Sequence, residues 1–203
     1  MQDTEALDLI DATANARKFQ VILKRLFDEM SVIDEKSNIV FRFLAIARQH
    51  YDTIVLLIEQ ERNPSSACAL LRPLSEVMNR GVWVSACAQP DQIRKIVTKT
   101  FDFAKVNFAK EVADSFGGNG LSQKQRDVLH GFTHGGYEQL ERQMSNRGLI
   151  EPEFDLPFLT KAVRSSSVAI SLLASHAAVT VDRLDIANAV WNTWVRLFEQ
   201  RIE

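Results

Sequence analysis

Hydrophobic residues recur every three to four positions along most of the chain, which predicts helices almost throughout. The first helix is expected at about residues 4–30. A second is expected at about residues 38–61, capped by Asp34 or Ser37. The expected apolar stripes are Leu7, Ile10, Ala14, Ile22 and Leu26 in the first helix, and Ile39, Phe43, Ile46, Ile54, Leu57 and Ile58 in the second. No alternating strand pattern longer than four or five residues occurs.

The segment at residues 65–88 is apolar almost all the way round, which is typical of a helix at the centre of a bundle. Pro73 lies inside it and is expected to kink the helix beside Arg72. Further helices are expected at about residues 89–115, 122–133, 137–145, 158–179 and 182–202. The pattern therefore predicts a single all-α domain over residues 1–203, with antiparallel helices joined by short loops.

Three charges interrupt the central segment at intervals of four residues: Arg72, Glu76 and Arg80. At about 100° per residue they fall within an arc of about 80° on one side of the helix. We expect protein to enclose this stripe, and two roles are open. The stripe is either an internal ion-pair network that fixes helix register or part of a functional site. Trp83, one turn further on, is expected to be core packing or, alternatively, a stacking wall for a ring.

A second group of unusual residues lies at residues 126–136. Arg126, His130 and His134 are spaced four apart and share one helix face, and two glycines follow His134. Three interpretations remain open: a metal shared by the two imidazoles, a structural role at a helix end and in the core, or a general base beside a fixed cation. The spacing of neighbouring acids matches no established metal motif, so we expect no metal and no cofactor.

Composition narrows the function classes. The chain has 203 residues, 46% hydrophobic and 25% charged, and a net charge of −2, so bulk charge does not recruit nucleic acid. Cys68 and Cys87 would be about 28 Å apart on a continuous helix and are expected to stay reduced. The N-terminal segment is acidic, unlike a secretory signal. The longest uncharged stretch, residues 165–181, is too short for a membrane span and contains His176. We therefore expect a cytoplasmic protein without membrane contact.

The segments HYDTIVLLIEQ, SACALLRPLSEVMNRGVWVSACA and LHGFTHGG together resemble an uncharacterised family of small all-helical bacterial proteins related to the HEPN superfamily. The similarity covers roughly residues 40–180. Its signature residues are His50, Arg72-Pro73, Glu76, Arg80, Trp83 and Thr133-His134-Gly135. The resemblance implies a HEPN-like bundle with additional N- and C-terminal helices, a homodimer, and metal-independent RNA cleavage of the toxin–antitoxin or phage-defence type, with an antitoxin as a protein partner.

The chain departs from the HEPN ribonuclease motif, in which four to six residues separate an arginine from a histidine. Here three residues separate Arg126 from His130, and seven separate it from His134. The resemblance implies His134 or His130 as the base, with Arg72, Arg80 or Arg126 on the phosphate and Glu76 holding the arginines. The expected substrate contacts are His50, Trp83, Thr133 and Gly135.

The rival hypothesis is a non-catalytic helical module that binds a nucleotide or a protein partner, with the same side chains forming a structural polar core. The two hypotheses differ in exposure, because catalytic groups open onto a cleft and a structural network is sealed.

Overall fold

The computed structural model describes residues 2–28, 30–60, 63–116 and 154–199. Of these residues 84% are helical, and no strand occurs among them, which confirms the all-α class. The helices are α1 (Gln2–Asp28), α2 (Glu35–Glu59), α3 (Pro64–Ala69), α4 (Leu71–Ala86), α5 (Pro90–Val97), α6 (Phe108–Phe116), α9 (Leu156–Val179) and α10 (Leu184–Phe198), with a 3₁₀ turn at Phe103–Lys105. The predicted helices at 122–133 and 137–145 lie outside the described residues.

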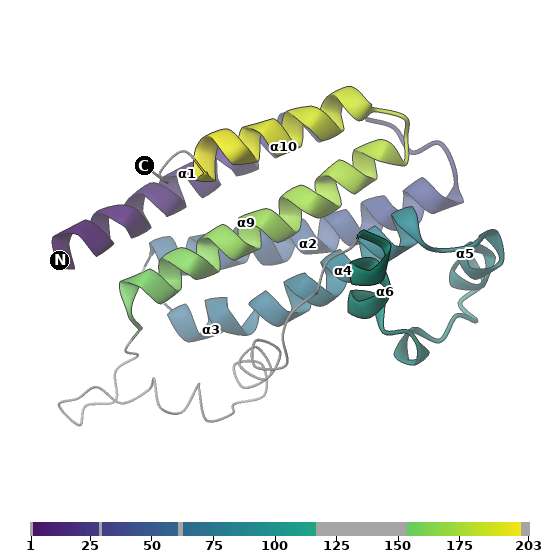
Figure 1. The fold of residues 1–203 in the computed structure, drawn as a ribbon, viewed down its shortest axis with the longest axis horizontal. Coiled ribbons are helices and arrows are strands. Elements are labelled where there is room, and N and C mark those ends of the chain that lie inside the picture. The colour runs from purple at the N-terminus through teal and green to yellow at the C-terminus, as the bar shows by residue number, and fades with distance from the viewer. Residues whose placement is uncertain (1, 29, 61–62, 117–153, 200–203) are drawn as a thin grey trace.

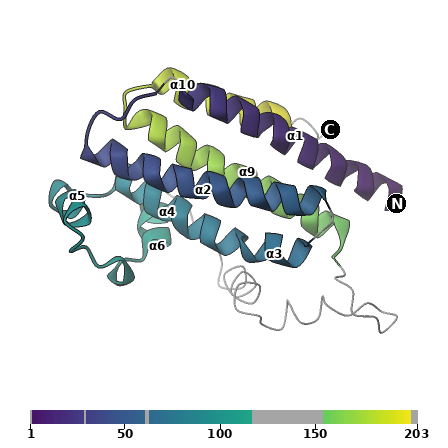
Figure 2. The same ribbon diagram turned by 180° about the vertical axis from the view of Figure 1, so that it is seen from behind.

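Helix α9 is the centre of the bundle and packs against α1, α2, α4 and α10. Figures 1 and 2 show α1 and α10 side by side on one side of α9, with α3 and α4 on the other. Small side chains on α9 allow these neighbours to approach closely, among them Ser166, Ser167, Ser171, Ala174, Ala177 and Ala178. One continuous hydrophobic core joins α1, α2, α4, α9 and α10.

A buried hydrogen bond ties α2 to α9 within this core. The hydroxyl groups of Tyr51 and Ser167 are 3.0 Å apart, and Tyr51 is fully buried. Burial raises the pKa of the Tyr51 phenol far above its usual value, so the hydroxyl stays neutral.

By length and composition α9 could also cross a membrane. However, 56% of its most apolar stretch is buried inside the bundle, and core helices often have this composition.

The predicted apolar stripe of the first helix is wrong for its N-terminal half. Leu7 and Ile10 are 59% and 61% exposed, and Ala14 is exposed as well. The face that enters the core carries Ala12, Ala16, Phe19 and Leu23 instead. Helix α1 therefore has two apolar faces, and the bundle covers only one of them.

The predicted disturbance near Pro73 is confirmed as a break between two helices. Helix α3 ends at Ala69, Leu70 forms a turn, and α4 begins at Leu71. Proline has no N–H to donate to the carbonyl four residues earlier, and its ring crowds that carbonyl, so the helix cannot run straight through.

The cap predicted for α2 is also confirmed, because the Asp34 side chain accepts a hydrogen bond from the backbone N–H of Ser37 at 2.7 Å.

The single helix predicted over residues 89–115 is wrong, because the chain leaves the helix after Val97 and re-enters it at Phe108. Lys99 adopts a left-handed conformation with φ of 60°. The N–H of Thr100 bonds to the carbonyl of Lys95, and the N–H of Lys99 bonds to that of Ile96. This is a Schellman motif with lysine at the position where glycine is favoured, so no glycine signals the helix end.

We expect Lys99→Gly to stabilise the fold by about 0.5–1 kcal/mol, because glycine adopts the left-handed conformation without the Cβ clash. Urea unfolding of the two proteins measures the difference. Lys99→Ala keeps the Cβ and is the matched control, with little expected change. A loss of stability in the glycine variant would show that the Lys99 side chain stabilises this turn.

Candidate functional site

The stripe of Arg72, Glu76 and Arg80 is not enclosed, which corrects the prediction from the sequence. The three side chains are 31%, 46% and 36% exposed. Arg72 Nε donates to Glu76 Oε1 at 2.8 Å, and Arg80 Nη2 lies 3.8 Å from Glu76 Oε2. The apolar flanks of α4 face α2, α6 and α9, and the charged arc remains in contact with water. It is a surface ion-pair row, not a sealed polar core.

This exposure sets the expected cost of breaking the row. Glu76→Ala should lower the free energy of unfolding by less than about 1 kcal/mol, because both arginines can still be hydrated. Thermal or urea unfolding measures it, with Asp91→Ala as the control for another exposed i,i+4 pair. A loss of 3–5 kcal/mol would instead mean that the arginines are desolvated.

Trp83 is a core residue, in agreement with the packing role expected first. It is 1% exposed, and its ring lies 5.6 Å from Phe101 and 5.1 Å from Phe108, measured between centroids. Its indole N–H donates to Glu111 on α6. The Arg80 guanidinium lies 5.8 Å from the Phe103 ring and covers this aromatic cluster from outside. Trp83 therefore has no free face on which a ligand could stack.

His50 is half-buried on α2, and its partial burial lowers the pKa of the imidazole. Helices α2 and α4 run antiparallel (Figure 1), and Phe43 lies opposite Gly81. Seven residues further along α2, His50 reaches the level of Leu74, which is two residues from Arg72. His50 is thus level with the Arg72 end of the stripe, whereas Arg80 is near the level of Phe43.

The other predicted site residues lie outside the described residues, namely Arg126, His130, Thr133, His134 and Gly135. Among the residues that the structure does describe, no three His, Cys, Asp or Glu side chains gather closely enough to hold a metal ion. Cys68 and Cys87 are both free thiols, as expected.

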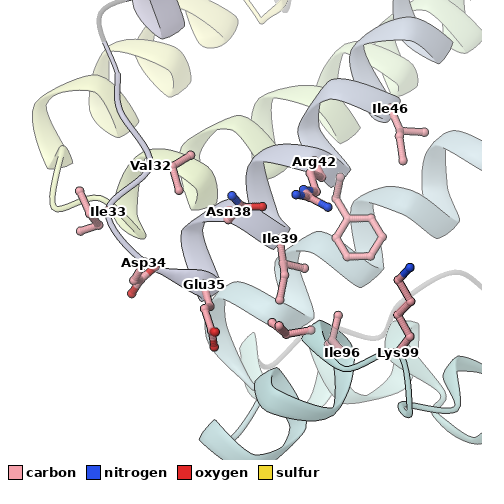
Figure 3. Close-up of a pocket in the computed structure, with 12 residues that line it drawn as sticks. Val32, Ile33, Asp34, Glu35, Asn38, Ile39, Arg42, Ile46, Ile96 and Lys99 are labelled. Carbon is pink, nitrogen blue, oxygen red and sulfur yellow. The ribbon is translucent and has the colours of Figure 1, made fainter.

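The described residues form a groove that the sequence did not indicate. It has a volume of about 690 Å³ and lies between the α1–α2 loop, the first half of α2 and the end of α5. Figure 3 shows its lining, which is mainly aliphatic: Val32, Ile33, Ile39, Ile46, Ile96 and Val97, with Phe43. Four of these side chains are exposed to solvent, with Ile33 62%, Val97 46%, Val32 44% and Ile46 41% exposed. Ile46, expected in the core, faces this groove instead.

The groove carries opposite charges at its two ends. In Figure 3 Arg42 and Lys99 lie at one end, and Asp34 and Glu35 lie at the other. None of these four forms an ion pair with another described residue, although Asp34 accepts two hydrogen bonds from Ser37 that hold the pKa of its carboxyl below the usual value. Arg42, Lys99 and Glu35 are therefore available to a ligand.

Comparison with known proteins adds one match. Residues 44–114 match a family of unknown function (DUF6988). No curated protein and no solved structure matches the chain. The matched third of the chain contains His50, the ion-pair row, Trp83 and four groove residues, Ile46, Ile96, Val97 and Lys99. The family has no assigned function, so the match gives none of these residues a role.

A serine–histidine contact, which the sequence did not suggest, joins α4 to α9. Ser85 Oγ lies 3.2 Å from His176 Nδ1 and 3.3 Å from the His176 carbonyl oxygen. Burial lowers the pKa of His176, so its imidazole is neutral near pH 7. Ser85 is only 8% exposed, and His176 is partly exposed. This pair therefore links two core helices.

Proposed function

We propose that this protein is a non-catalytic binding module that holds an amphipathic helix of a protein partner in the groove beside α2. The observation that carries the proposal is the lining, in which exposed isoleucines and valines surround a hollow with unpaired charges at both ends. Soluble proteins seldom leave such side chains together in water unless they contact a partner. An aliphatic groove of this kind fits the leucine face of a helix.

The lining favours a protein over a nucleotide. Among the described residues that line the groove, Phe43 alone is aromatic, and its ring already packs on Phe103 at 6.4 Å between centroids. Nucleotide sites commonly provide an aromatic face for the base, together with several phosphate contacts. Here two cations at one end and a carboxylate at the other match a helix with an acidic and a basic end.

Lys99 supports the same conclusion. Glycine would be favoured in its left-handed conformation, yet the chain has a lysine whose side chain lines the groove. Residues in unfavourable backbone conformations are common at binding sites, because a side chain that binding requires can be retained there although it lowers stability. Lys99→Gly is therefore expected to weaken binding while it stabilises the fold.

The test is titration of the protein into a fluorescein-labelled amphipathic helical peptide, with leucines at i, i+3 and i+7 and a terminal glutamate, followed by anisotropy. Ile46→Glu should raise Kd by at least about tenfold, since it places a charge on the apolar floor. Leu56→Glu is the matched control, because it lies on the same helix with 38% exposure but outside the groove. Equal binding by both variants and the wild type would reject the groove as the site.

A second candidate function is the metal-independent RNA cleavage that the HEPN resemblance implies. The observation in its favour is that Arg72 and Arg80 are exposed along one face and held by Glu76, so both can reach a phosphate. The test incubates total RNA with the protein in a chelator. Cleavage that Arg72→Ala and His134→Ala both abolish would support it, and intact RNA with the wild-type protein would reject it.

A further inference from the structure

The outward face of α1 is a second apolar surface, separate from the groove. Leu7, Ile10 and Val21 are 59%, 61% and 52% exposed, and Ala14 lies between them. Intervals of three, four and seven residues place all four on one side of the helix, opposite the core-facing Ala16 and Phe19. In both views α1 runs along one edge of the molecule (Figures 1 and 2). An apolar stripe on an edge helix is typical of an interaction surface.

The charges of α1 are divided between its two halves. The half from Gln2 to Ala14 contains four acidic residues and no basic one. The half from Asn15 to Asp28 contains four basic residues and one acidic residue. Such a helix is complementary in charge to a copy of itself that runs in the opposite direction.

We propose that α1 pairs with α1 of a second copy in an antiparallel arrangement, about a two-fold axis at Ala14. In this register Leu7 of one copy faces Val21 of the other, and Asp3 faces Arg25. The axis is at Ala14, where two small side chains meet and allow the helices to approach closely. The same patch serves both copies, as a two-fold interface requires.

A parallel pairing of the two helices would place like charges opposite each other. It would bring Asp3 against Asp3, Lys18 against Lys18 and Arg25 against Arg25, so like charges would repel along the whole contact. The antiparallel arrangement places the acidic half of each helix beside the basic half of the other. The direction of the pairing therefore follows from the charge division, and its location follows from the exposed stripe.

A contact between two single helices is small. Helix α1 has 27 residues and is about 40 Å long, so the contact is below the roughly 1,200 Å² of stable complexes. We expect a reversible dimer with Kd on the order of micromolar. The groove lies on the α1–α2 loop, α2 and α5 and is not part of this surface.

Sedimentation velocity of the full chain over a range of concentrations tests the proposal. The wild type should change from monomer to dimer as its concentration rises. Ala14→Arg places two cations at the axis and should raise the dimer Kd by at least about tenfold. Ala45→Arg, at an exposed alanine of α2, should leave it unchanged. A wild type that stays monomeric, or a dimer that Ala14→Arg does not weaken, would overturn the proposal.

A charge exchange tests the direction. Asp3→Lys and Arg25→Glu should each weaken the dimer several-fold, and the double variant should restore it, because position 3 again faces an opposite charge at position 25. In a parallel dimer the double variant would restore nothing. A double variant as weak as either single one would overturn the antiparallel register.

Discussion

Trp83→Ala is expected to destabilise the protein by about 3–5 kcal/mol, which is the largest effect of any single substitution considered for this chain. The side chain is 1% exposed and is the largest fully buried one among the residues that the structure describes. Its removal would leave a cavity between α4 and α6 among Phe101, Phe108 and the rest of the aromatic cluster. It would also leave Glu111 without the indole donor. Urea unfolding followed by far-UV circular dichroism measures the change.

Trp191→Ala is the control for this substitution. Trp191 is 43% exposed on α10, so its removal should cost about 1 kcal/mol or less. If Trp83→Ala cost no more than Trp191→Ala, the aromatic cluster would not be part of the core. The role of Trp83 as a packing residue would then be wrong, and a role in ligand binding would become the better account.

Gly81→Val is expected to have the second largest effect, a destabilisation of about 3 kcal/mol. A Cβ at this position would clash with Leu173 Cδ1 on α9 and lie 3.1 Å from Phe43 Cβ on α2. Valine adds two further methyl groups at the point where α2, α4 and α9 meet, and none of the three backbones can move aside easily. Thermal and urea unfolding measure the loss.

Gly81→Ala separates the clash from the helix propensity. In a helix interior, alanine is more favourable than glycine by about 0.5–1 kcal/mol. Its Cβ would meet only Phe43 and the end of the Leu173 side chain, and the Leu173 side chain can rotate. It should therefore cost about 1 kcal/mol or less. Equal stability of the alanine and valine variants would show that the three helices are not in close contact here. Because Phe43 also lines the groove, the valine variant should weaken peptide binding as well.

Helical periodicity was enough to predict most of the bundle. Helix α9 was expected at about 158–179 and is found at Leu156–Val179, and α2 begins at the cap expected from Asp34. These elements are long, strongly periodic and bounded by residues with clear capping chemistry. Prediction failed at residues 98–107, because Lys99 takes the left-handed position without the glycine that usually marks it.

The candidate site was harder to predict, because periodicity shows which positions are apolar but not which of them another helix covers. Helix α1 has two apolar faces, and the one with Leu7 and Ile10 was wrongly assigned to the core. Similarly, the apolar surroundings of Glu76 in the sequence suggested burial, yet its own arc of α4 faces water. The groove joins segments about fifty residues apart in the sequence. Its one local signal was Val32-Ile33, two apolar residues in a connecting loop.

The most direct test of the proposed function is an NMR titration of isoleucine methyl groups with the amphipathic peptide. The groove contains Ile33, Ile39, Ile46 and Ile96, whereas Ile54, Ile58, Ile170 and Ile186 are buried elsewhere in the core. Binding in the groove predicts saturable shifts of the first four methyl resonances, with the other four unchanged. Shifts spread evenly over both sets, or confined to the core set, would contradict the account.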